Sequence, residues 1–213
     1  MKRKPAATDS GESVANRILD VATRMFADRG YGSVTTRQIA AKARVTFPTM
    51  YRRFPSKREL YLAACGAVLE RAGSKYVDQV RQAGAAETRL LRVVTQFYDD
   101  LLTDPCLSKL VMREILDQDE KGLQHLTRNF FAPQYRAVRE ICRQLTDTDD
   151  VDRVAFSIYA VAFGYVQLSP IGRTMSIGGR WKQPESMARM ILQLILPAID
   201  WAGVPKLTEP RAS

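Results

Sequence analysis

Apolar residues recur at intervals of three and four along nearly the whole chain, which is the spacing of one face of an α-helix. No segment alternates apolar and polar residues in the manner of a β-strand. We therefore predict an all-α fold of about nine helices. Besides two short helices between residues 35 and 54, the pattern predicts helices over about residues 12–29, 56–83, 86–103, 106–117, 122–145, 149–168 and 184–202.

Proline and glycine residues interrupt this pattern at two places in the second half of the chain. Pro133 lies inside the segment 122–145 and is expected to bend it, because proline has no backbone N–H to donate. The segment 169–183 holds three glycines and is predicted to be an exposed loop.

Two short helices joined by a tight corner are predicted ahead of Pro55. Thr35 and Gln38 have the spacing of a capping box, in which each side chain accepts from the other residue's backbone N–H. Thr46 is placed to cap the second helix, and Pro48 fits near a helix start, where a missing N–H leaves nothing unpaired. Two short helices joined in this way are typical of a helix-turn-helix.

The second short helix divides its residues between a core face and an exposed face. Met50 and Phe54, together with Ile39 from the helix before, are predicted to be buried. The remaining side chains include hydroxyls, aromatic rings and guanidiniums, which suit phosphates and base edges. The candidate DNA-contact residues are Thr36, Arg37, Thr46, Phe47, Pro48, Thr49, Tyr51, Arg52 and Lys57.

Some of these candidates have a more specific expected role. Thr36 and Lys57 lie near helix N-termini, whose free N–H groups favour phosphate. Phe47 and Thr49 are suited to contact a thymine methyl group, and Arg37 is suited to bond guanine. For each residue taken singly, the alternative is an ordinary surface side chain.

The positive charge of the chain is concentrated in the same region. The 213 residues carry a net charge of +9. Residues 1–60 hold 13 Lys and Arg against 5 Asp and Glu, whereas residues 61–213 hold 19 against 18. A basic first quarter favours a polyanionic partner such as DNA, the alternative being a basic solvated surface.

Residues 14–60 resemble the DNA-binding domain of the tetracycline-repressor (TetR) family of bacterial regulators. The pattern consists of an aromatic residue and glycine after the first helix, then T-T-x-x-I-A, then V-[ST]-x-x-T-[LM]-Y-x-x-F-x-x-K. It is carried by Ile18, Ala22, Phe26, Gly30, Tyr31, Thr35, Thr36, Ile39, Ala40, Ala43, Val45, Thr46, Thr49, Met50, Tyr51, Phe54, Lys57 and Leu60. The resemblance implies that Tyr51 and Arg52 contact the DNA backbone.

The sequence departs from the family pattern at three positions. Arg44 stands where the family usually has glycine, Pro48 where it often has glycine or alanine, and Arg53 where it often has histidine or tyrosine. The first departure is expected to strain the corner, because glycine tolerates a positive φ and arginine does so poorly.

The resemblance implies a helix-turn-helix domain followed by a helical domain for ligand binding and dimerisation. We predict a disordered basic arm over 1–12, the DNA-binding domain over 13–58, the regulatory domain over 59–203 and a flexible tail over 204–213. A small-molecule pocket is implied in the second domain, and plain core packing is the alternative for each candidate. These candidates are Phe97, Met112, His125, Phe130, Tyr135, Tyr159 and Phe163.

The sequence offers little for catalysis or metal binding. His125 is the only histidine, which excludes a site with several histidine ligands. A nucleophile pair of Cys142 with His125 is conceivable, but no recognised motif flanks either residue. No glycine-rich phosphate-binding loop occurs. We therefore predict no enzyme activity, no metal and no cofactor.

Compartment and membrane contact follow from three features. The chain has three cysteines, which lie far apart in the sequence and include no C-x-x-C pair. This pattern favours a reducing cytoplasm. The basic N-terminus lacks the apolar region of a secretory signal. Residues 154–172 carry no charge, but their mostly apolar part falls short of the roughly 20 residues that span a bilayer. A helix buried on most sides is favoured over a membrane span, in a cytoplasmic protein located at the bacterial nucleoid.

The helices predicted over about 149–168 and 184–202 are apolar around more of their circumference than one core can cover. One side is expected to face its own domain and the other a second copy, giving a symmetric four-helix interface. The TetR resemblance also implies such a homodimer. A monomer with a large core is the alternative.

These features together predict a transcriptional regulator, a repressor that a small apolar ligand releases from a palindromic operator in double-stranded DNA. In a dimer the two recognition helices would lie about 34 Å apart, which is one turn of DNA. Two alternatives are a helical enzyme or carrier for an apolar small molecule, and a DNA-binding dimer with no effector.

Overall fold

The computed structural model describes residues 11–117, 120–176 and 183–207, without the side chains of residues 11–13, 74–81, 117, 126, 129 and 130. Most of the predicted basic arm and the end of the predicted tail lie outside these ranges. The predicted all-α fold is confirmed, and no strand occurs in the described ranges. The helices are α1 (Gly11–Ser33), α2 (Thr36–Lys42), α3 (Phe47–Arg53), α4 (Lys57–Arg81), α5 (Ala86–Thr103), α6 (Pro105–Asp117), α7 (Glu120–Leu126), α8 (Ala132–Cys142), α9 (Val151–Thr174) and α10 (Pro184–Ile195), with a π-helical turn, η1 (Thr127–Phe131), between α7 and α8.

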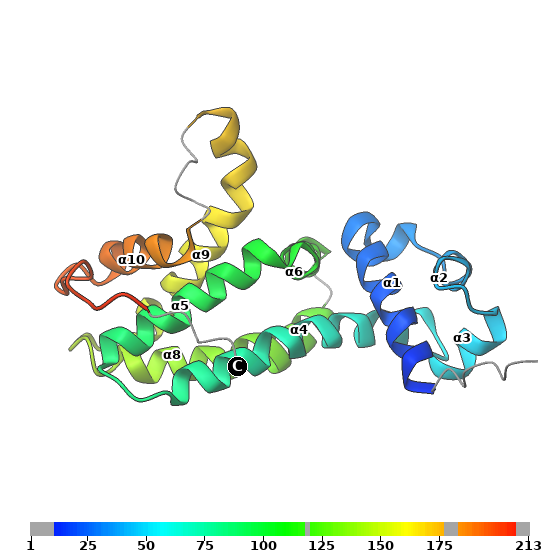
Figure 1. The fold of residues 1–213 in the computed structure, drawn as a ribbon, viewed down its shortest axis with the longest axis horizontal. Coiled ribbons are helices and arrows are strands. Elements are labelled where there is room, and N and C mark those ends of the chain that lie inside the picture. Colours follow the sequence, from blue (N-terminus) through cyan, green and yellow to red (C-terminus); the bar gives the residue numbers. More distant parts are fainter. Residues whose placement is uncertain (1–10, 118–119, 177–182, 208–213) are drawn as a thin grey trace, which may run out of the picture.

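Figure 1 shows α1, α2 and α3 at one end of an elongated molecule and α5, α8, α9 and α10 in the body at the other. The long helix α4 begins beside the three-helix end and runs along the body (Figure 1). Ile39 and Met50 are fully buried in the three-helix end, as the sequence predicts. Phe97 and Tyr98 of α5 are fully buried in the body.

The segment predicted as one bent helix over 122–145 is helical without interruption from Glu120 to Cys142, and it ends earlier than predicted. It consists of α7, the π-helical turn η1 and α8, and Pro133 stands in the first turn of α8. Because proline cannot donate the hydrogen bond of a regular α-helix, the irregular turn falls just before it. The wider turn sends Thr127 and Phe131 toward a cavity described below.

The elements near the C-terminus also differ from the sequence prediction. Helix α9 continues to Thr174 with Pro170 inside it, so the predicted loop over 169–183 is wrong in its first part. Helix α10 ends at Ile195, well before residue 202. Beyond α10, Trp201 is buried and its Nε1 donates to the Leu196 carbonyl at 3.1 Å. This bond holds the chain after α10 against the C-terminal end of that helix.

Helix α9 is not buried on most sides, contrary to the sequence prediction. By length and composition it could cross a membrane, but one such helix is weak evidence, since the core helix of a soluble protein passes the same test. Only 28% of its most apolar 18-residue stretch is buried. Phe156, Leu168 and Ile171 on this helix and Met175 at its C-cap are large exposed apolar residues.

The corner between α2 and α3 contains the strain expected at Arg44. This residue has a φ of 55°, in the left-handed region that glycine occupies without penalty. Backbone bonds hold it there: Arg44 N–H donates to the Ala41 carbonyl at 3.2 Å, and Val45 N–H donates to the Ala40 carbonyl at 3.0 Å.

We predict that Arg44→Gly raises the free energy of unfolding by about 0.5–1 kcal/mol, because relief of the left-handed strain exceeds the extra chain entropy of glycine in the unfolded state. Urea denaturation measures the change. Arg44→Ala is the control, since it removes the same side chain but keeps the strain. Equal stability of the two variants would contradict the prediction.

Candidate functional site

Local hydrogen bonds fix the geometry of the helix-turn-helix. The predicted capping box is present: Gln38 N–H donates to Thr35 Oγ1 at 3.3 Å, and Thr35 N–H donates to Gln38 Oε1 at 2.9 Å. The second cap is also present, because Thr49 N–H donates to Thr46 Oγ1 at 3.4 Å. The Thr46 and Thr49 hydroxyls lie 2.8 Å apart, so they bond each other. Both helices therefore start at positions set by their own sequence.

Three of the candidate DNA-contact residues form an exposed cluster at the start of α3. The rings of Phe47 and Tyr51 lie 4.5 Å apart, and these side chains are 37% and 38% exposed. The Arg37 guanidinium from α2 lies 5.5 Å from the centre of the Phe47 ring, within cation–π distance. Large aromatic rings are usually covered by protein, so their exposure here indicates a contact surface.

The other candidates surround this cluster at the same end of the molecule. Pro48 and Arg52 are exposed, Thr36 is half-buried, and Thr46 and Thr49 are engaged in the cap of α3. Lys57 is the first residue of α4, and its Nζ lies 4.3 Å from the centre of the Tyr31 ring. The cation–π contact holds this ammonium group beside the helix start.

Helix α6 holds the C-terminal end of α1. Arg113 donates from Nε to the Ala27 carbonyl at 3.0 Å and from Nη2 to the Asp28 carbonyl at 2.9 Å. Lys109 Nζ lies 2.6 Å from Asp28 Oδ1, and this bond lowers the pKa of the Asp28 carboxyl. Gly30 has a φ of 80°, and a Cβ there would lie 2.9 Å from Arg113 Nη1. The positive φ favours glycine here, and the absence of a Cβ leaves room for the guanidinium.

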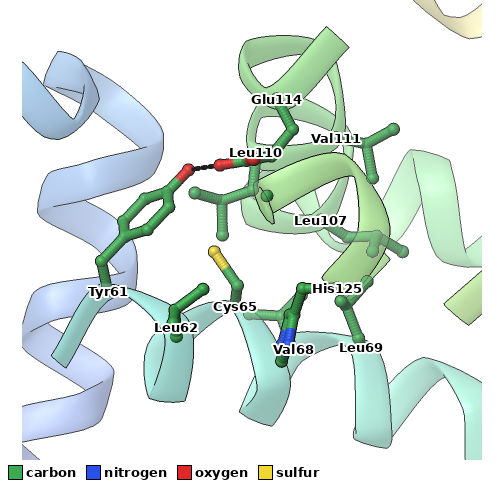
Figure 2. Close-up of a pocket in the computed structure, with 11 residues that line it drawn as sticks. Tyr61, Leu62, Cys65, Val68, Leu69, Leu107, Leu110, Val111, Glu114 and His125 are labelled. Carbon is green, nitrogen blue, oxygen red and sulfur yellow. Dashed lines mark hydrogen bonds between the residues drawn. The ribbon is translucent and has the colours of Figure 1, made fainter. Parts of the chain in front are cut away.

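A small enclosed cavity lies between α4 and α6 (Figure 2). The Tyr61 hydroxyl of α4 donates to the carboxylate of Glu114 of α6, which is only 5% exposed. The second carboxylate oxygen, Oε2, has no hydrogen-bond partner. The cavity measures about 10 Å³, which is room for about one water. Burial raises the pKa of the Cys65 thiol, which faces this cavity, to about 12.

A larger cavity of about 420 Å³ lies among α6, η1, α8 and α9. Of the predicted pocket residues, Tyr135, Tyr159 and Phe163 line it. Phe97 packs behind it, with its ring edge-on to Tyr159 at 4.8 Å. The other residues of the lining were not predicted from the sequence; they are Val111, Ile115, Thr127, Phe131, Ala132, Phe156 and Ala160.

The remaining predicted pocket residues lie elsewhere. His125 lines the small cavity beside Glu114, and Met112 lines neither cavity. The side chain of Phe130 lies outside the described ones. Helical spacing places Phe131 and Phe156 with Tyr135 and Tyr159, but it does not separate cavity walls from core, and that difference requires the packing of neighbouring helices.

The structure gives no support to a Cys142–His125 nucleophile pair. Cys142 is fully buried on α8 and lines neither cavity, whereas His125 lines the small one. Burial raises the pKa of the Cys142 thiol to about 12, so the thiol is protonated at neutral pH and a poor nucleophile. In the described part of the chain, no three His, Cys, Asp or Glu residues come together as a metal site would need.

Comparison with known proteins matches residues 18–64 to the family model of bacterial regulatory proteins of the tetR family. The chain is 32% identical over 130 residues to the transcriptional activator FasR of Mycolicibacterium smegmatis, covering 59% of this chain and 53% of FasR. It is 31% identical over 103 residues to the transcriptional repressor KstR of the same organism, covering 48% and 50%. The chain thus spans about half the length of these relatives.

Solved structures resemble the fold over most of the chain. The regulator FadR from Bacillus subtilis, determined with stearoyl-CoA, has a TM-score of 0.72 at 16% identity and covers 87% of this chain and 99% of FadR. A TetR-like regulator from Rhodococcus has a TM-score of 0.66 at 19% identity, covering 94% and 100%. At these identities the likeness concerns the fold alone. Residues 18–64 therefore match the DNA-binding domain of the tetR family of bacterial regulatory proteins, and the similar proteins and structures are transcriptional regulators.

Proposed function

We propose that the protein is a transcriptional regulator that binds a palindromic operator as a homodimer and responds to a small apolar effector. The observation that carries the proposal is the exposed cluster of Arg37, Phe47 and Tyr51 on a capped helix-turn-helix in the basic part of the chain. Relatives named as a transcriptional activator and a transcriptional repressor support it. Its place of action is the bacterial cytoplasm, at the nucleoid.

In this proposal α3 enters the major groove, as the second helix of a helix-turn-helix does. Phe47 and Arg37 contact base edges, with the ring against a thymine methyl and the guanidinium at guanine. Thr36, Arg52 and Lys57 bind phosphates at the rim of the groove. The Tyr51 hydroxyl completes the backbone contacts. Thr46, Pro48 and Thr49 set the start of α3 and lie against the groove.

The proposed dimer forms through α9 and α10. Both helices carry exposed apolar residues, among them Phe156 at 66%, Leu194 at 63% and Met190. A contiguous apolar surface on a soluble monomer marks an interaction site, and symmetric pairing of the two helices would cover it. The pairing would present two α3 helices to successive turns of one DNA face.

The cavity of about 420 Å³ is the proposed effector site, since its size falls within the roughly 300–1,000 Å³ of small-molecule sites. The stearoyl-CoA in the structure of FadR supports an effector with an apolar chain. Helix α6 links the site to the DNA-binding end. Val111 borders both cavities, Glu114 bonds α4, and Arg113 bonds α1.

An effector that displaces α6 would move α1 and the start of α4 together, and thus alter the spacing of the two recognition helices. Such a response requires the effector to bind the two arrangements with different affinity. We propose that the effector favours the arrangement that no longer fits the operator, so that its binding releases the protein from DNA.

The proposed DNA contact is tested with an operator selected from a random pool. We expect Lys57→Gln to weaken binding about threefold to tenfold at physiological salt for every sequence. The slope of log affinity against log salt should decrease by about 0.9 per protomer, because one phosphate contact is lost from each. Fluorescence anisotropy at several salt concentrations measures both. Lys121→Gln, which removes the same charge on α7, should behave as wild type, and a wild-type affinity and slope for Lys57→Gln would contradict the assignment.

The proposed base contact of Phe47 is tested by removing single methyl groups from the same operator. Replacing the contacted thymine by uracil should weaken wild-type binding about threefold to tenfold, because a buried methyl contact is lost. Phe47→Ala should bind the two DNAs equally. If Phe47→Ala stays sensitive at the same thymine, another residue makes the contact.

The proposed dimer is tested by placing a charge on its apolar surface. Leu194→Glu should shift the protein to monomer at micromolar concentration, because the carboxylate would be buried without a partner. Sedimentation equilibrium measures the change, and Gln82→Glu in the loop after α4 is the control. A wild-type protein that is monomeric under these conditions would contradict the proposal outright.

A further inference from the structure

A second hollow adjoins the proposed effector cavity. It measures about 740 Å³, lies more open to solvent, and shares Ile115 and Thr127 with the first. Its other lining residues differ in character from those of the inner cavity: they are Glu120, Leu123, Gln124 and Arg128. The two hollows therefore adjoin, and the outer one adds polar and charged side chains to the apolar inner one.

The π-helical turn η1 provides residues to both parts. Thr127 borders both hollows, Arg128 lines the outer one and Phe131 lines the inner one. A regular α-helix here would rotate these side chains relative to one another, since π-helical turns insert an extra residue. Single π-helical turns occur often at functional sites, and this one connects the apolar and polar parts.

The inner cavity is unsuited to a charged group. Its walls are almost entirely aliphatic and aromatic carbon, and the Tyr135 hydroxyl is occupied, donating to Asp152 Oδ1 at 2.5 Å. Tyr159 is buried, its hydroxyl has no hydrogen-bond partner, and burial raises its pKa well above the usual range. The lining thus holds no cationic side chain, and the charge of an anion placed here would have no partner.

The outer hollow contains a cation that lacks a carboxylate partner. Among the residues that the structure describes, no Asp or Glu oxygen lies within 4.0 Å of the Arg128 guanidinium, whereas Arg139 and Arg189 each have one. The nearby carboxylate of Glu120 accepts from Gln124 Nε2 at 3.2 Å. Arg128 is therefore available to bind an anion at the mouth of the apolar cavity.

We propose that the effector is an amphipathic anion, whose apolar chain occupies the inner cavity and whose acidic group binds Arg128. The proposal rests on the effector role of the inner cavity and adds the chemistry of the head group. The acid is either a free carboxylate or a phosphate attached through a thioester carrier. In the first the charge is on the end of the apolar chain, and in the second it lies beyond the neutral arm of the carrier.

The test compares three ligands with the same chain: dodecanoate, dodecanoyl-CoA and dodecanol. Calorimetry with the full-length protein measures their affinities, and the selected operator reports release. We expect wild type to bind at least one anionic ligand tenfold or more tightly than dodecanol, since charge-assisted bonds to guanidinium are strong. The tighter of the two anions identifies the source of the acidic group.

Arg128→Gln should reduce the preference for the anionic ligand over dodecanol to about twofold, while leaving dodecanol binding unchanged. Arg128→Lys should keep most of it, and Lys121→Gln should behave as wild type, because it removes an equal charge from α7 outside the hollow. Thermal denaturation confirms that each variant is folded. Ala160→Phe, which fills the inner cavity, should weaken the binding of all three ligands more than tenfold.

Three outcomes would overturn the inference. Equal wild-type binding of dodecanol and both anions would exclude a head-group site but leave the apolar effector site standing. An equal loss for Arg128→Gln and Lys121→Gln would show a diffuse charge effect in place of a site at Arg128. If no ligand binds and none changes operator affinity, the apolar effector of the proposed function is wrong as well.

Discussion

The placement of the DNA-binding end against the body depends on the hydrogen bonds from Arg113 of α6 to α1. Gly30 has non-helical backbone angles inside α1, and Arg113 donates to the carbonyls of Ala27 and Asp28 in the turn before it. Glycine adopts the positive φ at this position without penalty and leaves room for the guanidinium. Together with the Lys109–Asp28 ion pair, these bonds join the DNA-binding end to α6 in addition to its connection through α4.

One face of α6 borders the proposed effector site and another holds the DNA-binding end. Val111 and Ile115 border the large cavity, and between them in sequence Arg113 and Glu114 contact α1 and α4. A shift of α6 toward or away from the cavity must therefore alter at least one of these bonds. Because coupling between binding sites is reciprocal, bound operator would favour the empty cavity to the same degree that effector disfavours DNA.

The parts of the fold that follow from the sequence are those set by near neighbours. The caps at Thr35 and Thr46 involve residues three apart, and their spacing alone predicts both helix starts. The bonds from Arg113 to α1 join residues 85 and 86 positions apart, and no local pattern indicates them. The π-helical turn lies between these cases, because Pro133 predicts a bend but not the widened turn that directs Thr127 and Phe131 into one cavity. The geometry of the helix-turn-helix was accordingly easier to predict than the lining of the cavity.

Phe156 has a position that links the two proposed functions of the body. It borders the large cavity and is also among the most exposed apolar side chains of α9. If α9 pairs with its copy, the cavity mouth lies beside the dimer interface, and an effector that moves Phe156 acts on the pairing as well as on α6. Operator binding depends on the distance between two recognition helices, which both the interface and the α6 contacts set. A small displacement of the Phe156 ring would then change the distance between the recognition helices through both the dimer interface and the α6 contacts. Packed interfaces convert such displacements into discrete rearrangements.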